Sequence, residues 1–387
     1  MSHTFIRLTS QERAVGLPLT DEPVSDGWAD AATDVRESAR ESLEAILTAA
    51  VQRDRCYVLF SGGRDSSALL ALATSVARSS GAPDPVPVTG RHPDAPESDE
   101  TQWQDLVVRH LGLREHLVLD LDGEQGLLSD SSISSLRRRG LLWPTGLHVQ
   151  PRYVRDLQPG GAIITGEGGD LTVSGRRITA IGAAVREGRP RRAARLLGPS
   201  IVPARPGKVG GEYAQTLPWL TSAGREAVAA MIRPRREPLG WGADLRRVVT
   251  RRPMRMGGAN LVAIFADEGF EAVSPFDHPR FVRALAREGG FWGLGDRTAL
   301  MRRLFGDLLP DAVLARTTKA AFNAVRFTGR EREFARSWNG AGVDGTYVHP
   351  DRLRAAWLSE DAPPASAIHL HAAWLAENGL RWEPDGT

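Results

Sequence analysis

The stretch Ser61-Gly62-Gly63-Arg64-Asp65-Ser66-Ser67 decides the fold of this chain, because it joins an apolar run to a helical pattern. The run Cys56-Tyr57-Val58-Leu59-Phe60 before it predicts a buried strand, and the apolar spacing after it predicts a helix over 65–78. A strand, a glycine turn and a helix in this order place free backbone N–H groups where an anion can bind. No lysine closes the stretch as it would in the P-loop pattern G-x-x-x-x-G-K-[ST], so another kind of phosphate loop is indicated.

The residue types of this stretch suit a nucleotide phosphate. Glycines let the backbone approach a phosphate closely, and serine hydroxyls add hydrogen bonds. An aspartate cannot bind a phosphate directly, but it can hold a Mg²⁺ ion that neutralises one. The alternative is an ordinary Gly-Gly turn that caps a helix. The phosphate-binding residues that we predict here are Ser61, Gly62, Gly63, Asp65, Ser66 and Ser67, with Asp65 as a magnesium ligand.

The composition of the 387 residues is that of a globular protein with a large core: 41% are hydrophobic and 25% are charged. The sequence has no apolar run long enough to span a membrane and no signal-peptide pattern at its start. A single cysteine, Cys56, excludes a disulfide within the chain, so we expect a cytoplasmic protein. The net charge of +2 does not indicate a nucleic-acid partner.

The order of predicted elements indicates an α/β fold. Residues 1–29 read as an irregular N-terminal extension, and residues 30–175 as a nucleotide-binding core in which strands and helices alternate. Such alternation predicts a parallel sheet with helices on both faces and ligands at the carboxyl ends of the strands. From residue 176 to 387 the pattern is mainly helical. The predicted strands are 56–60, 86–89, 116–119 and 162–165, and the predicted helices of the core are 31–52, 65–78, 99–111 (capped by Ser98) and 148–157.

A second glycine turn, Gly166-Glu167-Gly168-Gly169-Asp170, follows the predicted strand 162–165. Its position repeats that of the first turn, so acidic side chains from two strand ends are expected at one edge of the sheet. Magnesium bound to a triphosphate needs one or two carboxylates and fills its other positions with phosphate oxygens and water. Asp170 is therefore the predicted second magnesium ligand beside Asp65, and Gly166 joins the predicted nucleotide site.

Together these turns resemble the asparagine synthetase family, whose synthetase domain carries S-G-G-x-D-S and then G-E-G-x-D. The resemblance extends over about residues 30–380. Further landmarks of the family follow in order, and they are Ser98-Asp99-Glu100, Pro275-Phe276-Asp277, Leu309-Pro310, Arg316 and Lys319-Ala320-Ala321-Phe322. The resemblance implies an adenine nucleotide α-hydrolase-like fold with an ATP pyrophosphatase loop, with ATP as a substrate and Mg²⁺ as its ion.

The resemblance also implies two catalytic residues. Lys319 matches the family lysine that stabilises negative charge as pyrophosphate leaves, a role suited to a preorganised cation. Lys208 and Lys319 are the only lysines among the 49 basic residues, so Lys319 stands out in a chain that otherwise uses arginine. Glu167 matches the family acid that handles protons on the incoming amine.

Two departures from the family pattern concern the substrates. In asparagine synthetases an N-terminal glutaminase domain that begins with a cysteine supplies ammonia, whereas Ser2 follows Met1 here and 30 residues are too few for that domain. After Asp170 the family continues E-L-F-G-G-Y near the acyl-substrate pocket, but this chain has Leu171-Thr172-Val173-Ser174-Gly175-Arg176. We therefore do not expect glutamine-dependent amidation by this chain alone, and aspartate is in doubt as its substrate.

The function that we predict is an ATP-dependent amide-bond-forming ligase, which adenylates a carboxylate, releases pyrophosphate and transfers the acyl group to an amine. The resemblance includes β-lactam synthetases and lasso peptide cyclases, so a biosynthetic cyclase or ligase with a small-molecule or peptide carboxylate substrate is favoured. Partner proteins of a biosynthetic pathway fit this reading, and a membrane partner does not.

Three alternatives remain open. The first is an asparagine synthetase that uses free ammonia or a separate glutaminase. The second is a tRNA-modifying ATP pyrophosphatase, and the third is a binding module without catalysis. The arginine-rich stretches 185–199 and 231–256 are either solvated helices and loops or a grip for an acidic or peptide substrate.

Overall fold

The chain folds around a five-stranded parallel sheet with the strand order β3-β2-β1-β4-β5. The computed structural model describes residues 4–24, 36–93, 99–121, 123–201, 207–232, 236–318 and 326–383. The strands are β1 (Cys56–Leu59), β2 (Val86–Arg91), β3 (Leu117–Asp120), β4 (Ala162–Ile164) and β5 (Glu271–Val273). This sheet, with helices around it, confirms the predicted α/β class. The fifth strand comes from the region that the sequence indicated as mainly helical.

Successive side chains of the central strands enter two different cores, as the two-residue period of a strand requires. Cys56 and Val58 of β1 and Ala162 and Ile164 of β4 are buried in one apolar cluster. Tyr57 and Ile163, which lie opposite each other in the ladder, are buried in the cluster on the other face. Burial on both faces explains why these strands are continuous apolar runs.

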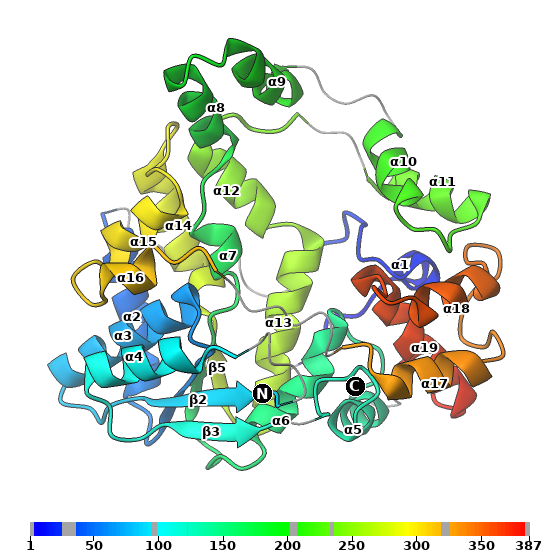
Figure 1. Ribbon diagram of the computed structural model, residues 1–387, viewed down its shortest axis with the longest axis horizontal. Coiled ribbons are helices and arrows are strands. Elements are labelled where there is room, and N and C mark those ends of the chain that lie inside the picture. The colour runs from blue at the N-terminus through cyan, green and yellow to red at the C-terminus, as the bar shows by residue number, and fades with distance from the viewer. Residues whose placement is uncertain are drawn as a thin grey trace.

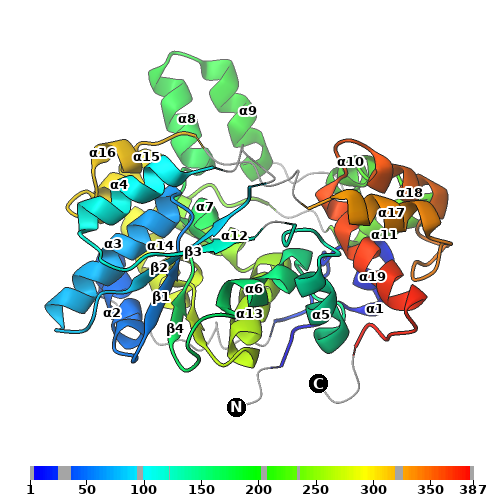
Figure 2. The same ribbon diagram turned by 60° about the horizontal axis from the view of Figure 1, so that its bottom comes forward.

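Helices cover both faces of the sheet (Figures 1 and 2). On one face α3 contacts β1, and α2 contacts both β4 and α14. On the other face α13 contacts β5 and α6. The helices of these two layers are α2 (Ala39–Val51), α3 (Arg64–Ser79), α4 (Thr101–Leu111), α6 (Gln150–Val154), α13 (Arg252–Asp267), α14 (Pro279–Gly289), α15 (Arg297–Phe305) and α16 (Asp311–Leu314).

A third apolar cluster lies beneath the C-terminal helices and includes the buried Trp219, Trp338, Trp357 and Trp374. The mainly helical C-terminal half that the sequence predicts is confirmed. The helices of this region are α1 (Ser10–Val15), α5 (Asp130–Arg139), α10 (Lys208–Gln215), α11 (Ser222–Met231), α17 (Gly329–Ser337), α18 (Pro350–Leu358) and α19 (Ala367–Glu377). The remaining α-helices are α7 (Gly169–Thr172), α8 (Arg177–Arg186), α9 (Pro190–Ile201) and α12 (Trp241–Val249).

The extension predicted as irregular over residues 1–29 contains one short helix in its described part, and the other residues of 4–24 form neither helix nor strand. Ser10–Val15 form α1, and a capping box of Thr9 and Glu12 stabilises its N-terminus. Glu12 is fully buried, and both of its oxygens accept hydrogen bonds from Arg252, at 2.7 and 2.9 Å. The sequence suggested a polar loop because its central charge finds a partner only 240 residues further along the chain.

Three helix boundaries also differ from expectation. The helix predicted over 99–111 begins at Thr101, because Asp99 instead accepts a hydrogen bond from the backbone N–H of Thr101 at 2.9 Å; Ser98 lies outside the described residues. The helix predicted over 148–157 is a 3₁₀ turn, Thr145–Val149, followed by the short α6. Of the helix predicted over 31–52, residues 31–35 lie outside the described part and residues 36–38 are not helical, so α2 begins at Ala39 after its N-cap Ser38.

Two expectations about the chain as a whole concern its cysteine and its apolar segments. Cys56 is a buried free thiol, and burial raises its pKa to about 12. No helix in the described ranges combines the length and the apolar composition that crossing a bilayer requires.

Candidate active site

Both glycine turns lie at the carboxyl ends of the two central strands. β1 pairs with β4, and from this pair the strand order runs to β2 and β3 on one side and to β5 on the other. The sheet therefore has its topological switch point between β1 and β4, where open α/β sheets bind ligands. The turn 61–67 follows β1, and the turn 166–170 follows β4.

The first turn ends in an α-helix N-terminus that is open to an anion. Gly62 has a φ of +83°, a conformation that favours glycine, and Gly63 is the N-cap of α3 without a side-chain cap. The Ser66 hydroxyl accepts a hydrogen bond from the N–H of Ser61 at 3.2 Å and donates to the carbonyl of Gly63 at 3.2 Å. The side chains of the turn thus fix its backbone. The first N–H groups of α3 form the positive end of the helix dipole, and no side chain caps them.

The second glycine turn, residues 166–170, packs directly against the first helical turn of α3. A Cβ atom added to Gly166 would lie 3.3 Å from the backbone nitrogen of Ser66. A Cβ atom added to Gly169 would lie only 2.5 Å from Cγ of Asp65. The glycines of G-E-G-G-D are therefore needed because two strand ends approach more closely than a side chain would allow.

Asp65 and Asp170 both bind the guanidinium group of Arg297. Nη2 of Arg297 lies 2.8 and 2.7 Å from the two carboxylate oxygens of Asp65, and its Nη1 lies 2.5 Å from Oδ1 of Asp170. The Asp65 side chain is 16% exposed and that of Asp170 is 58% exposed. Burial raises the pKa of Asp65, Arg297 lowers it and the charge of Asp170 raises it further.

This arrangement fits a magnesium ion. Two carboxylates from neighbouring strand ends already converge on one positive group, and their oxygens are the hard ligands that Mg²⁺ prefers. No cluster of three or more possible metal ligands of the His, Cys, Asp or Glu type occurs in the described part of the chain. A protein site with two carboxylates, completed by phosphate oxygens and water, is the kind that Mg²⁺ with a nucleotide uses.

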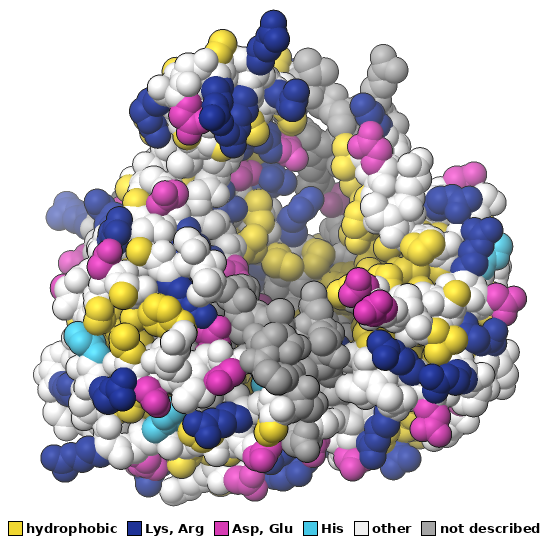
Figure 3. Space-filling model, in the orientation of Figure 1, with side chains coloured by type: hydrophobic (Ala, Val, Ile, Leu, Met, Phe, Trp, Pro, Cys, Tyr) yellow, Lys and Arg dark blue, Asp and Glu magenta, His cyan; other side chains and the backbone are white. Residues whose placement is uncertain are grey.

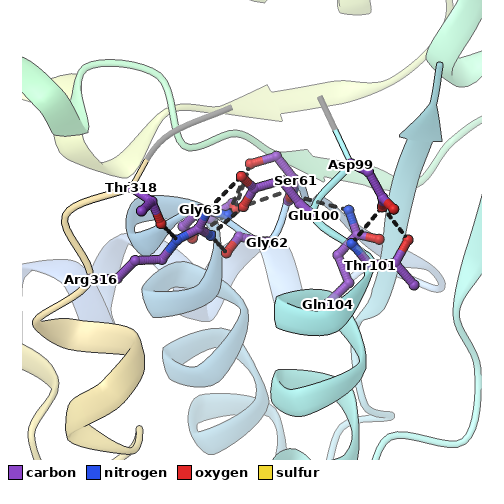
Figure 4. A network of polar contacts seen from close by, with 10 residues as sticks. Ser61, Gly62, Gly63, Asp99, Glu100, Thr101, Gln104, Arg316 and Thr318 are labelled. Carbon is purple, nitrogen blue, oxygen red and sulfur yellow. Dashed lines mark hydrogen bonds and ion pairs between the residues drawn. The ribbon is translucent and has the colours of Figure 1, made fainter. Parts of the chain in front are cut away.

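A buried network beside the first turn connects it to two distant segments (Figure 4). Arg316 forms an ion pair through both of its terminal nitrogens with Glu100, and it donates to the carbonyl of Gly62 at 3.1 Å. Its Nε donates to Thr318 at 2.8 Å, and its guanidinium lies 4.7 Å from the ring centre of Trp103. Near this network the amide of Gln104 donates to the carbonyl of Ser61 at 3.1 Å.

A further acidic group lies near the second turn, at the end of β5. A Cβ atom added to Gly168 would lie 3.0 Å from Cβ of Asp277, and Nη1 of Arg255 lies 3.5 Å from Oδ1 of Asp277. The adjacent His278 accepts from the N–H of Arg280 and so caps α14. Burial lowers the pKa of His278 to about 4, with the positive charges of Arg280 and Arg255 adding to this. The landmark Pro275-Phe276-Asp277 thus lies against G-E-G-G-D.

The other predicted site residues differ in how exposed they are, and one of them lies outside the described residues. Glu167 is exposed at the edge of the sheet, and its N–H donates to the hydroxyl of Thr165 at 3.4 Å. Ser61 is also exposed, whereas Ser67 is fully buried and its hydroxyl has no hydrogen-bond partner among the described residues. Lys319 lies outside the described residues, and the structure is described up to Thr318 on that side.

Sequence reasoning missed Arg297 and gave no role to Glu100 or Arg316. A signal for Arg297 exists, since it is the first residue of α15, directly after the N-cap Asp296. A positive side chain is unfavourable at the positive end of a helix. Its presence there indicates that it is held by acids elsewhere, and these are Asp65 and Asp170.

The fold and the paired turns define an α/β protein whose candidate ligand site lies at the switch point of its sheet. The chain belongs to the asparagine synthase family, because the family model described as asparagine synthase matches residues 38–378. A comparison with curated proteins gave no significant match. Members of this family use ATP as a substrate, generally with Mg²⁺, and the match supports an ATP-dependent ligase-type function.

Proposed function

We propose that this chain forms an amide bond in two steps at the junction of β1 and β4. In the first step a carboxylate oxygen attacks the α-phosphorus of ATP, the bond to the β-phosphate oxygen breaks, and pyrophosphate leaves. In the second step an amine attacks the acyl carbon, loses a proton, and displaces AMP. Family membership supports the ligase class, and the geometry of the two turns supports the position of the reaction.

The observation that carries this proposal is the convergence of Asp65 and Asp170 on one cationic group at the switch point of the sheet. Carboxylates brought this close repel each other unless a positive charge lies between them. A bound Mg²⁺ ion would supply charge neutralisation for the phosphates at these two residues. The glycine N–H groups and the N-terminus of α3 would bind the phosphate oxygens next to it.

The remaining predicted residues take the following roles in the proposal. Ser61, Gly62, Gly63, Ser66, Ser67 and Gly166 form the nucleotide site. Glu167, exposed at the same edge, accepts the proton that the amine loses. Lys319 follows Thr318 by one residue, and it would stabilise the negative charge of the leaving pyrophosphate.

The particular ligase that we propose is a biosynthetic cyclase or ligase of the kind of lasso peptide cyclases and β-lactam synthetases. The support is the replacement of the family's E-L-F-G-G-Y by residues 171–176, directly after Asp170. In the structure Arg176 donates to the carbonyl of Leu171, so this segment folds back on α7. Its altered residues would therefore act next to the site, where the acyl substrate binds.

Pyrophosphate release from ATP, measured over a panel of carboxylates with and without added amines, tests the proposal. We expect release that depends on one class of carboxylate and stops when magnesium is chelated. Robust formation of asparagine from aspartate and ammonia would instead establish the asparagine synthetase alternative. Absence of release with every carboxylate, together with no ATP binding, would contradict the ligase function.

A further inference from the structure

Helices α8 and α9 form a hairpin that projects from the body of the protein in both ribbon views (Figures 1 and 2). In α8 only Ile178 and Ala184 are buried, and no residue of α9 is buried. The hairpin is fixed at its base, where Arg177 pairs with Glu237 and donates to the hydroxyl of Ser200 at 3.1 Å. Its remaining surface is therefore available to a partner.

The charge of this hairpin is one-sided. Five exposed arginines lie between residues 186 and 195, and they are Arg186, Arg189, Arg191, Arg192 and Arg195. Glu187 is the one acidic residue of the whole segment 177–201. Its Oε2 lies 3.2 Å from Nη1 of Arg189 and 3.8 Å from Nη1 of Arg192. Within the described ranges no acidic side chain pairs with the other three arginines. Figure 3 shows the basic side chains gathered at this end of the molecule.

A helix that is merely solvated has a different pattern. On helix α17, Gly329–Ser337, Nη1 of the exposed Arg330 lies 2.7 Å from Oδ1 of Asp130, and the exposed Glu333 follows three residues later, so charges of both signs offset each other. Uncompensated like charges on the hairpin repel one another in the free protein, and a bound anionic partner would relieve this repulsion. The imbalance in α8 and α9 thus indicates binding of an anion.

The second arginine-rich stretch shares this property only in part. Arg252 is buried and paired with Glu12, and Arg247 lies 2.7 Å from Asp244. On the same helix, α12, Trp241 and Val249 are fully buried. The arginines of this stretch that have these partners therefore hold α12 and α13 in place. Arg236, Arg246 and Arg251 of this stretch are exposed and form no ion pair with a described acidic side chain, but the segment 236–251 also carries Glu237 and Asp244, whereas the stretch 185–199 carries a single acid.

The hairpin lies close to the candidate site along the chain and in space. Four residues, 173–176, separate it from α7, which begins in the G-E-G-G-D turn, and α7 and α8 both contact α12. Below it the face drawn in Figure 3 is deeply hollowed, and apolar side chains line the hollow. A substrate held at the hairpin could therefore extend toward the turn that carries Glu167 and Asp170.

We propose that the α8–α9 hairpin binds an acidic segment of a peptide substrate, which deepens the proposed function by naming its substrate class. The exposed apolar side chains of Val185 and Ile201, at 63% and 57%, flank the arginines and suit a peptide that mixes acidic and apolar residues. Segment 177–201 contains no aromatic residue, whereas single-stranded nucleic acid is typically bound by stacking on aromatic side chains.

Binding of a fluorescein-labelled peptide rich in glutamate and leucine, measured by anisotropy without ATP, tests this inference separately from catalysis. The triple variant R186E/R191E/R195E reverses the charge of the three arginines that have no acidic partner among the described residues. The control R109E/R114E/R352E makes the same change in net charge at three exposed arginines elsewhere. We expect roughly tenfold weaker binding in the first variant, wild-type binding in the control, and weaker binding at higher salt.

Several outcomes would overturn the inference. They are no binding of the peptide, equal losses in both triple variants, unchanged binding of the version in which glutamine replaces glutamate, and tighter binding of a single-stranded RNA of the same length. Pyrophosphate release from ATP with the class of carboxylate that the panel identifies would persist in each of these cases if the ligase function is correct, so the two proposals fail separately.

Discussion

Arg316 and Glu100 form an ion pair that is buried at the edge of the candidate site, with side-chain exposures of 4% and 7%. The same guanidinium donates to the carbonyl of Gly62 and to the hydroxyl of Thr318 (Figure 4). One side chain thus joins the nucleotide turn, the start of α4 and the residue that precedes Lys319. Arg316 is therefore a positioning residue, since it holds groups that are proposed to contact ATP.

Replacing this arginine by lysine should impair nucleotide binding while the charge is kept. The ammonium of an R316K variant cannot reproduce a planar guanidinium that donates to Glu100, Gly62 and Thr318 together. Small misplacements of binding groups cost activity steeply, so we expect at least about tenfold loss of pyrophosphate release. Calorimetric titration with magnesium-ATP and a pyrophosphate assay measure the two effects.

The matched control is R252K, because Arg252 also forms a buried pair, with Glu12, at a place outside the two turns. Both variants should lose stability, since each disturbs a buried pair. Only R316K should lose ATP affinity per folded molecule. Equal ATP affinity in the two variants would reduce Arg316 to a purely structural role.

Charge removal at the paired aspartates should abolish the magnesium dependence of ATP binding. D65N and D170N keep the shape of each side chain but remove a carboxylate from the cation position. Residues that only support metal ligands commonly contribute 10- to 100-fold, so loss of a ligand should lower pyrophosphate release at least about 100-fold. D351N, at an aspartate whose side chain is 94% exposed on α18, is the control. Wild-type magnesium dependence in D65N would place the metal elsewhere.

Much of the fold could be predicted because its central strands are buried on both faces. The two central strands, Cys56–Leu59 and Ala162–Ile164, are apolar throughout, and a glycine turn follows each of them. The sequence therefore indicates both where these strands lie and where they end at the edge of the sheet. β5 escaped prediction because Glu271–Val273 is only three residues long and begins with an exposed glutamate. Such a strand is defined by its pairing with β4 and has no sequence pattern of its own.

The candidate site could be predicted only in part, for a similar physical reason. Asp65 and Asp170 follow parallel strands, and parallel strands end at a common edge, so their proximity follows from the order of elements. Arg297 lies 232 residues after Asp65 on a helix outside the sheet. No local sequence pattern indicates that these two side chains lie in contact. The same holds for the pairing of Arg316 with Glu100, 216 residues apart.

A methyl group at Gly169 should disrupt the site more than the fold. Its Cβ would lie 2.5 Å from Cγ and 2.7 Å from Oδ2 of Asp65, so the carboxylate has to move away from Arg297. Overpacking of this kind typically costs about 1–3 kcal/mol of stability. We expect G169A to fold and to bind magnesium-ATP at least about tenfold more weakly by calorimetry.

G211A provides the comparison for this variant, because a Cβ atom at Gly211 of α10 meets no atom within 4 Å. Alanine in place of glycine inside a helix stabilises by up to about 1 kcal/mol, so G211A should melt no lower than the wild type. Its ATP affinity should be unchanged. If G169A bound ATP as G211A does, the close approach of the two turns would have no part in nucleotide binding.

Two buried histidines should make the protein less stable in mild acid. His148 and His371 are fully buried with ring centres 5.0 Å apart. Burial lowers the pKa of His371 to about 4, a shift that its hydrogen bond to the Leu127 carbonyl opposes, and burial lowers the pKa of His148 well below its usual value. Between the folded pKa and the ordinary value the unfolded chain binds more protons, so the free energy of unfolding falls as the pH falls.

For His371 alone this loss is about 2 kcal/mol between about pH 7 and about pH 5. Urea unfolding at the two pH values measures it. In H371Q the side-chain amide can still donate to the Leu127 carbonyl, which His371 binds through Nε2 at 2.8 Å, but it cannot titrate. The difference in unfolding free energy between the two pH values should therefore shrink in H371Q. An undiminished difference would mean that other groups cause the acid sensitivity.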